Sequence, residues 1–300
     1  MNILTLSQVS KSFGNHKVID DLSFQVSENT IYGFIGENGA GKTTTMKMIL
    51  GLNPVDTGEI LVNGEKVTYG QTSTNRFIGY LPDVPEFYGY MTPSEYLRLC
   101  GDITGIPQKR MNSRISELLE LVGLDKLNKR IQGFSRGMKQ RLGIAQALLN
   151  QPKLLICDEP TSALDPIGRK EIIDILQSVK EQTTVIFSTH ILSDVERICD
   201  EIGLLHQGKL AFQGKLEEIR KIRRSDGFEI EFYKEEDARH FGSIYKGGER
   251  IGKTQLFYAG KGEEDMLAAM KALYDNHLHP IKVEMREPSL ESLFLEVVGK

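Results

Sequence analysis

The stretch GFIGENGAGKTTTMKMIL, Gly33 to Leu50, decides the fold of this chain. Ile31 to Ile35 is a short apolar run suited to a buried strand, and Lys42 to Leu50 reads as a helix. The glycines between them let the backbone turn sharply, with its N–H groups free to point inward at an anion. The positive end of the helix dipole faces the same point. We therefore predict a strand, an anion-binding loop and a helix, in that order.

The spacing within this loop indicates which anion it binds. Gly36, Gly41, Lys42 and Thr43 fulfil the pattern G-x-x-x-x-G-K-[ST]. In this pattern the lysine reaches the β- and γ-phosphates of a nucleoside triphosphate, and the hydroxyl ligates Mg²⁺. The alternative is an ordinary glycine loop between a strand and a helix. The ordered arrival of strand, loop, lysine, hydroxyl and helix favours the nucleotide site.

A second nucleotide element is LLICDEPTSALD, Leu154 to Asp165. Its apolar residues predict a buried strand, and Asp158 at the end of that strand is placed to hold Mg²⁺ directly or through water. Glu159 is placed where a general base would orient the attacking water. The simpler alternative is a strand that ends in a solvated acidic turn. The glycine loop elsewhere in the chain favours the catalytic interpretation.

Between these elements lies GFSRGMKQRLGIAQALL, Gly133 to Leu149. Ser135 is a typical helix cap, and Gly137 leaves the first turn of the predicted helix bare. An exposed helix N-terminus that cannot reach its own chain's loop would serve as an anion site for a second molecule. A capped amphipathic helix is the alternative, and this segment taken alone favours that alternative.

Composition limits the class of protein. The chain has 300 residues, of which 40% are hydrophobic and 26% charged, so we expect an ordinary globular protein with a main domain and a smaller one. No apolar run approaches the roughly 18 residues that cross a bilayer, and the N-terminal residues lack the pattern of a signal peptide. Cys100, Cys157 and Cys199 are scattered, which argues against a structural zinc site. These features predict a cytoplasmic location.

The charge pattern bears on partners. The net charge is −4 and both signs are interleaved along the chain, so no basic footprint for nucleic acid is visible. We therefore expect no nucleic-acid partner.

Two regions are expected along the chain. Alternating β and α patterns run from Ile3 to about Leu216, which is typical of a sheet covered by helices. We place a main domain at residues 1–220 and a small α+β domain at residues 227–300. The latter has three strand-like runs, FEIEFY, TQLFYA and IKVEM, and a helix from Glu263 to Asn276. A final apolar helical stripe is expected at Leu290, Leu293, Phe294, Val297 and Val298.

The segments GENGAGKTT, FSRGMKQRL, LLICDEP, SALD and STH occur in this order, and the set closely resembles the nucleotide-binding subunits of ATP-binding cassette (ABC) transporters. The resemblance covers roughly Ile3 to Leu216. It is specific, because Ser135 to Leu142 matches the signature helix that distinguishes cassette ATPases from other P-loop proteins. It implies an α/β fold: a P-loop NTPase core of the ABC type, with a helical subdomain at about residues 84–150.

The resemblance also assigns roles to residues. Glu159 is implied as the catalytic base, His190 as the switch histidine that contacts the γ-phosphate, and Phe13 as the aromatic that stacks on adenine. Asp158 belongs to Walker B, and Ser135 and Gly137 to the signature. Thr43, Asp158 and Asp83 are the implied Mg²⁺ contacts. The Walker A loop comprises Gly36, Glu37, Asn38, Gly39, Ala40, Gly41, Lys42, Thr43 and Thr44.

Partners follow from the same resemblance. In such proteins two cassettes close head to tail over two ATP molecules, which implies a homodimer with ATP and Mg²⁺ as ligands. A single cassette whose tail ends in PSLESLFLEVVG is similar to the ATPases of ABC-2 type exporters, in which the membrane permease is a separate polypeptide. Peptide antibiotics, other drugs, lipids and sodium ions all remain open as cargo. The chain would then lie on the cytoplasmic face of the cell membrane.

The segment PEFYGYMTPSEYLRL, Pro85 to Leu99, lies where the family receives the coupling helix of the permease. Its aromatic residues are equally suited to line such a groove and to form the core of the helical subdomain. They are Phe87, Tyr88, Tyr90 and Tyr96.

Two positions depart from the family pattern. The Q-loop has Asp83 in place of glutamine, and the signature has Arg136 where a first glycine is usual. Arg136 is familiar in ABC-2 export ATPases. Asp83 is shorter and anionic, which puts the Mg²⁺ and water contact of the Q-loop in doubt. The rival function is a soluble cassette ATPase of DNA repair or translation; against it stand the lack of a second cassette, of a long coiled-coil insertion and of basic stretches.

Overall fold

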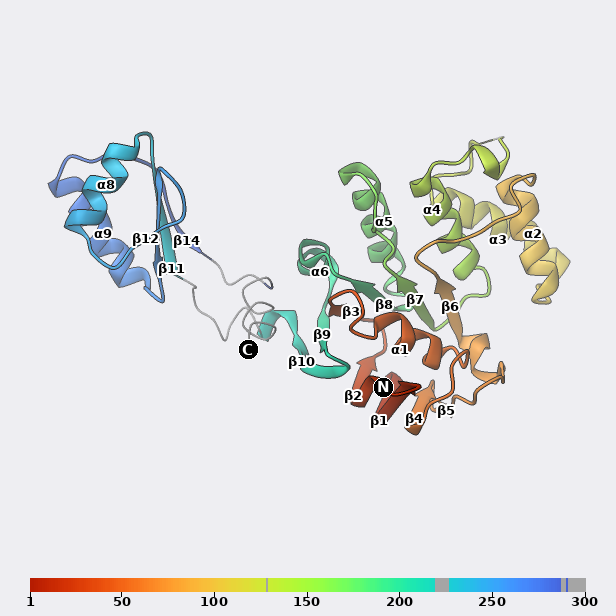
Figure 1. Cartoon of the computed structure of the whole chain (residues 1–300). Coiled ribbons are helices and arrows are strands. Elements are labelled where there is room, and N and C mark those ends of the chain that lie inside the picture. The colour runs from red at the N-terminus through yellow and green to blue at the C-terminus, as the bar shows by residue number, and fades with distance from the viewer. Residues whose placement is uncertain (128, 219–226, 287–289, 291–300) are drawn as a thin grey trace. The chain divides into compact units, whose positions relative to one another are not determined.

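The computed structural model describes residues 1–127, 129–218, 227–286 and 290. The chain divides into two compact units, Met1–Leu216 and Glu217–Lys300. Figure 1 shows the first unit from red to green and the second in blue. Each unit has a hydrophobic core of its own. Within the described part of the chain, no helix combines the length and the apolar character needed to span a membrane.

A six-stranded sheet forms the centre of the first unit, with the order β10-β9-β3-β8-β7-β6. β10 pairs antiparallel with β9, and the other neighbours pair in parallel. All residues of β3, β7 and β8 are buried, as expected for strands covered on both faces. The strands are β3 (Ile31–Gly36), β6 (Ile78–Leu81), β7 (Leu154–Asp158), β8 (Thr184–Thr189), β9 (Glu201–His206) and β10 (Lys209–Lys215).

A second, antiparallel sheet lies beside the first and has the order β2-β1-β4-β5. The helix-covered sheet expected from the sequence is thus present, whereas the sequence did not predict that the N-terminal strands pair among themselves in a second sheet. Phe24 of this sheet stacks on Tyr32 and Phe34 of β3, at centroid distances of 5.6 and 5.4 Å, so the two sheets share one core. The strands are β1 (Asn2–Phe13), β2 (His16–Ser27), β4 (Thr57–Val62) and β5 (Glu65–Lys66).

Helices α2, α3 and α4 lie together beyond β6 (Figure 1). Their inward faces bury apolar residues such as Leu97, Met111 and Leu142. The helices of the unit are α1 (Lys42–Ile49), α2 (Pro93–Ile103), α3 (Gln108–Leu121), α4 (Arg136–Ala147), α5 (Pro166–Val179) and α6 (Leu192–Ile198), with short 3₁₀ segments at Ser73–Phe77 and Ile131–Gly133.

The second unit is a β-α-β-β-α-β arrangement with the antiparallel order β12-β13-β11-β14. Phe228, Ile230, Phe232 and Tyr258 alternate along its strands and pack with Phe241 of α8. The three expected strands and the helix are present, whereas α8 and β12 were not predicted. The elements are β11 (Gly227–Phe232), α8 (Glu235–Ile244), β12 (Glu249–Arg250), β13 (Gln255–Ala259), α9 (Glu263–Asp275) and β14 (Pro280–Arg286).

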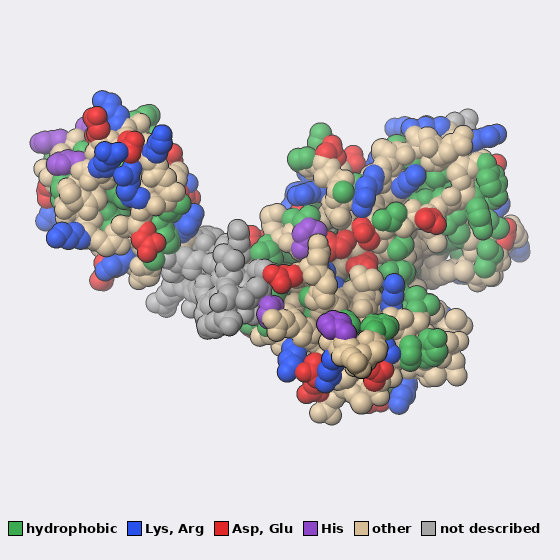
Figure 2. All heavy atoms as spheres, viewed as in Figure 1, with side chains coloured by type: hydrophobic (Ala, Val, Ile, Leu, Met, Phe, Trp, Pro, Cys, Tyr) green, Lys and Arg blue, Asp and Glu red, His purple; other side chains and the backbone are tan. Residues whose placement is uncertain are grey.

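The last expected helical stripe falls almost entirely outside the described residues. Of its members only Leu290 is described, and it is buried. Basic and acidic side chains are interspersed on the visible face of both units (Figure 2).

Candidate functional site

The glycine-rich loop joins β3 to α1 at the carboxyl end of the central sheet, where ligands of parallel α/β proteins bind. Gly39 and Gly41 have φ values of +85° and +109°, which favour glycine. A Cβ atom at Gly41 would lie 2.4 Å from Cδ1 of Ile19, and one at Gly36 would lie 2.6 Å from the carbonyl oxygen of Leu205. Side chains are therefore excluded at Gly36 and Gly41, which leaves the backbone of the loop facing the candidate ligand site.

The first turn of α1 is open to an anion. Gly41 is its N-cap, and no side chain of the described residues caps this end of the helix. The first turn contains no acidic residue. Its N–H groups and the positive end of the helix dipole are thus directed at the loop.

Lys42 is buried, and its ammonium group is held at the loop by three oxygen atoms. It donates to the carbonyl oxygens of Gly36 at 2.7 Å and Glu37 at 3.2 Å. Its Nζ also lies 3.2 Å from Oε1 of Glu159. A buried ammonium group with carbonyl and carboxylate partners is a suitable partner for phosphate oxygens.

Asp158 ends β7 and is buried, and each of its carboxylate oxygens accepts one hydroxyl. Oδ2 accepts from Oγ1 of Thr43 at 2.7 Å, and Oδ1 accepts from Oγ of Ser188 at 2.6 Å. The strand order brings these side chains together. Ser188 lies on β8, which is between β7, the strand that ends in Asp158, and β3, the strand that leads to the helix of Thr43. Mg²⁺ usually binds one or two protein oxygens together with substrate phosphates and water, and Thr43 and Asp158 supply a donor set of that kind.

Glu159 follows in a left-handed backbone conformation with φ of +49°. Its Oε2 lies 2.9 Å from Nδ1 of His190, and its buried Oε1 is the oxygen that lies 3.2 Å from Nζ of Lys42. The turn brings this carboxylate to the cavity between the ammonium group of Lys42 and the imidazole of His190. A carboxylate held in this way is placed to accept a proton from a water molecule.

These groups surround a cavity of about 260 Å³. Val18 was not predicted from the sequence, because it belongs to β2 rather than to a motif. Asp83 reaches the cavity from the loop after β6. The lining residues are Val18, Glu37, Asn38, Gly39, Gly41, Lys42, Thr43, Thr44, Asp83, Asp158 and Glu159.

Other residues predicted for the site do not line this cavity. Gly36 ends β3 and Ala40 is buried in the loop, and neither lines the cavity; His190 reaches the site through Glu159. Phe13 is 51% exposed at the end of β1, with Nζ of Lys11 over its ring at 5.3 Å. Ser135 and Gly137 lie at the start of α4, where the exposed Ser135 caps the helix by accepting from the N–H of Met138.

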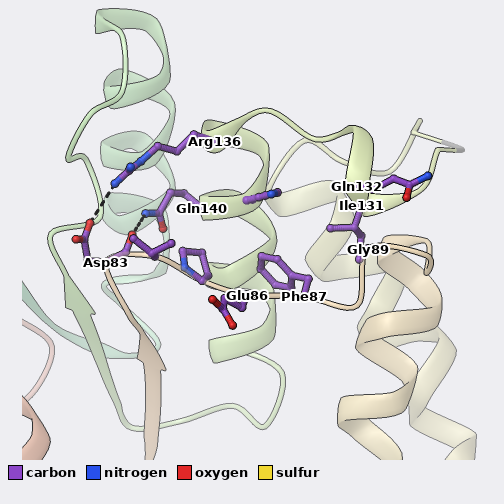
Figure 3. A pocket seen from close by; sticks show the side chains of 11 residues that line it. Asp83, Glu86, Phe87, Gly89, Ile131, Gln132, Arg136 and Gln140 are labelled. Carbon is purple, nitrogen blue, oxygen red and sulfur yellow. Dashed lines mark hydrogen bonds and ion pairs between the residues drawn. The ribbon is translucent and has the colours of Figure 1, made fainter.

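Asp83 connects this cavity with a second one. Its carboxylate lies 3.1 Å from Nη2 of Arg136, and its carbonyl oxygen accepts from Nε2 of the buried Gln140 at 2.6 Å (Figure 3). Partial burial raises the pKa of Asp83, and the nearby Asp158 and Glu159 act in the same direction against the positive charge of Arg136. The second cavity, of about 450 Å³, is lined by Asp83, Val84, Pro85, Glu86, Phe87, Gly89, Ile131, Gln132, Arg136, Lys139 and Gln140.

The aromatic residues of this region divide between the two roles considered for them. Tyr96 is buried in the helical subdomain, and Phe87 packs edge-on against it at 5.1 Å while lining the second cavity. Tyr88 and Tyr90 are 54% and 63% exposed. Of the four aromatic residues, only Phe87 lines the second cavity, which we call the groove.

A family model described as "ABC transporter" matches residues 19–162. The chain is 37% identical over 304 residues to the uncharacterized ABC transporter ATP-binding protein YxlF of Bacillus subtilis (strain 168), covering 99% of both chains. It is 38% identical over 305 residues to the bacitracin transport ATP-binding protein BcrA of Bacillus licheniformis, covering 99% of this chain and 97% of that one.

A solved structure described as the ATP binding subunit of an ABC transporter matches with a TM-score of 0.66 and 34% identity. The match covers 73% of this chain and 92% of that chain. The glycine-rich loop and the acidic pair Asp158–Glu159 thus occur on a fold shared with ATP-binding subunits of ABC transporters. The chain is a member of the ATP-binding subunits of ABC transporters, and it is an ABC-type ATPase that binds and hydrolyses ATP.

Proposed function

We propose that this chain is the ATPase of an ABC-2 type exporter, which pairs as a homodimer and drives a separate integral membrane subunit. The full-length similarity to a bacitracin transport ATP-binding protein supports this assignment, because it includes the second unit as well as the cassette. In this function the chain works at the cytoplasmic face of the membrane, where ATP is present.

The roles within the site follow from the contacts of the chain. The loop N–H groups and Lys42 would bind the phosphates, and Thr43 and Asp158 would hold Mg²⁺, which would supply positive charge to offset the negative charge of the phosphates. Lys42 is paired with Glu159. The ammonium group of Lys42 would also bind the phosphates, and Glu159, which His190 holds at its other oxygen, would accept a proton from the attacking water.

The second copy completes the site. The N-terminus of α4 carries Ser135 and Gly137 and does not line the cavity of its own chain. Because this helix N-terminus is exposed, it is suited to bind phosphates that lie in the nucleotide cavity of a partner chain. We propose that Phe13 contacts adenine within the same chain, at the edge of β1.

Coupling to the membrane subunit rests on one observation: Asp83 lines both the nucleotide cavity and the neighbouring groove. A segment of the membrane subunit that fills this groove would contact Phe87 and Lys139 and would press on Asp83. Movement of Asp83 toward or away from the nucleotide then connects ATP binding with movement of the partner. The cargo contacts the membrane subunit, so its identity is not decided by the cavities of this chain.

The groove provides the test. The tagged chain is purified from membranes with detergent, and retained proteins are identified by mass spectrometry. We expect a polytopic membrane protein to be retained, and we expect Lys139→Glu to reduce its retention while ATP binding stays unchanged. Lys109→Glu, which lies at another cavity on α3, is the matched control. Equal retention by the Lys139→Glu and Lys109→Glu variants would contradict the groove, and purification with ribosomes or DNA instead would favour the rival function.

A further inference from the structure

Ser188 occupies a special place in the central sheet. It is the penultimate residue of β8 and is fully buried. In the parallel register it lies opposite Phe34 of β3 on one side and Asp158 of β7 on the other. The strand that carries it therefore separates the strand before the phosphate loop from the strand that supplies the catalytic carboxylates.

The hydroxyl of Ser188 connects two consecutive residues of the site. It donates to Oδ1 of Asp158 at 2.6 Å and accepts from the backbone N–H of Glu159 at 3.1 Å. The same N–H also lies 3.1 Å from the carbonyl oxygen of Ser188. Since Thr43 donates to the other oxygen of Asp158, this carboxylate is fixed between two hydroxyl groups.

The contact with the backbone matters because Glu159 has φ of +49°. A residue with a side chain adopts this region only when its surroundings hold it there. The hydrogen bonds to Ser188 supply such a restraint at the residue whose carboxylate lies between Lys42 and His190.

We infer that Ser188 is a positioning residue of the ATPase site. Its hydroxyl orients the Asp158 carboxylate for Mg²⁺ and holds the Glu159 backbone in the turn that directs the side chain into the cavity. Ser188 does not line the nucleotide cavity, so it acts through these two neighbours. The inference rests on the roles proposed above for Asp158 and Glu159.

Neighbouring hydroxyl groups do not share this task. The Oγ1 of Thr189 accepts from the N–H of Ile191 in the turn around His190. Thr183, just before β8, is also buried and donates to the carbonyl oxygen of Pro152 at 2.8 Å. Thr183 therefore offers a matched control: a buried hydroxyl bond next to the same strand, but outside the nucleotide site.

The test uses the full-length chain and the variants Ser188→Ala, Ser188→Thr and Thr183→Val. Affinity for a non-hydrolysable ATP analogue is measured by calorimetry with Mg²⁺ and with EDTA. In Ser188→Ala we expect the affinity in EDTA to change by less than about twofold, while the gain in affinity that Mg²⁺ produces falls roughly tenfold, the lower range for losing a partner of a metal ligand. The Mg²⁺ concentration for half-maximal hydrolysis rises in the same proportion.

Rescue and control complete the design. Ser188→Thr keeps the hydroxyl and should restore most of the Mg²⁺ response, whereas Thr183→Val should retain all of it. If Ser188→Ala does not fold, Ser188→Cys replaces it, because a thiol is a weak hydrogen-bonding group. A folded Ser188→Ala or Ser188→Cys variant with a normal Mg²⁺ response overturns the inference, and so does an equal loss in Thr183→Val. Normal hydrolysis in Glu159→Gln would instead refute the proposed base while leaving the Mg²⁺ arm of this test intact.

Discussion

The guanidinium group of Arg136 lies 3.1 Å from the carboxylate of Asp83. Each residue departs from the usual pattern of the family, one in the signature and one in the Q-loop, and in the folded chain they are paired (Figure 3). Both side chains are partly exposed, so an isolated pair of this kind contributes only about 0–1 kcal/mol to stability. The main effect of the pair is electrostatic. The positive charge of Arg136 offsets the negative charge that Asp83 adds near Asp158 and Glu159.

This pair predicts a non-additive mutational result. Arg136→Gly leaves the charge of Asp83 uncompensated near the bound phosphates, so we expect ATP affinity to fall by roughly threefold to tenfold. Asp83→Gln should keep ATPase activity, and the double variant Asp83→Gln/Arg136→Gly should regain the lost affinity. Nucleotide titration of the three variants measures the coupling. Additive effects in the double variant would show that the two charges act independently.

Asp83 also has a predicted role in coupling. Asp83→Ala should mainly weaken the stimulation of hydrolysis by the membrane subunit, since the residue lines both cavities. Basal and stimulated ATPase rates in reconstituted vesicles provide the measurement. Normal stimulation in Asp83→Ala, together with normal transport, would leave the Q-loop of this chain without the assigned role.

The shared site predicts complementation between inactive chains. A Lys42→Ala chain lacks the phosphate-binding lysine, and a Ser135→Arg chain has a blocked helix N-terminus. Mixed heterodimers should contain one intact site and regain part of the activity, because in the proposed pairing Lys42 of one copy meets Ser135 of the other. Differently tagged chains purified in sequence allow the heterodimer to be assayed. A heterodimer that remains inactive would show either that the two chains do not share a site in this way or that one intact site cannot hydrolyse ATP without the other.

The second unit is predicted to be dispensable for nucleotide binding. All residues that line the nucleotide cavity lie in the unit Met1–Leu216. Removal of residues 217–300 should therefore change the Kd for ATP by less than about threefold, while pairing of chains or coupling to the membrane subunit changes. Circular dichroism must first show that the shortened chain is folded. Loss of ATP binding in a folded variant would show that the tail completes the site.

The loop geometry predicts a strong difference between two glycines. Gly41→Ala places a Cβ 2.4 Å from Cδ1 of Ile19 at a φ of +109°, so we expect nucleotide binding to be lost. Gly14→Ala, in the turn between β1 and β2, also has a positive φ, but its Cβ would meet no atom of the described residues within 4 Å. The control should cost only about 1 kcal/mol of stability and keep nucleotide binding. Calorimetry and thermal melting compare the two variants. Unchanged nucleotide binding in Gly41→Ala would contradict the prediction.

Most residues that line the candidate nucleotide cavity were predictable from the sequence, because they lie in short contiguous segments. The spacing of Gly36, Gly41 and Lys42 and the acidic pair after Leu154–Cys157 each lie within one short segment. Ser188 was not predictable in the same way. Its contact with Asp158 depends on the order of β7 and β8 in the sheet, which no local pattern records.

The same limit applies to the rest of the fold. The pairing of Asp83 with Arg136 joins residues from different motifs and is visible only when β6 and α4 are packed together. In the second unit, α8 was missed because only Ala238 and Phe241 of this short helix are buried, which is too few for a clear period. The separate N-terminal sheet was missed because strand patterns do not specify which strands pair.

The most direct test of the account is the hydrolysis rate of Glu159→Gln, because this residue stands between Lys42 and His190 in the proposed mechanism. We expect the variant to bind ATP, to lower turnover by roughly 10² to 10⁴-fold, and to form an ATP-bound dimer on gel filtration. A purified Glu159→Gln chain that hydrolyses ATP at the rate of the unmodified protein would contradict the central role of this carboxylate.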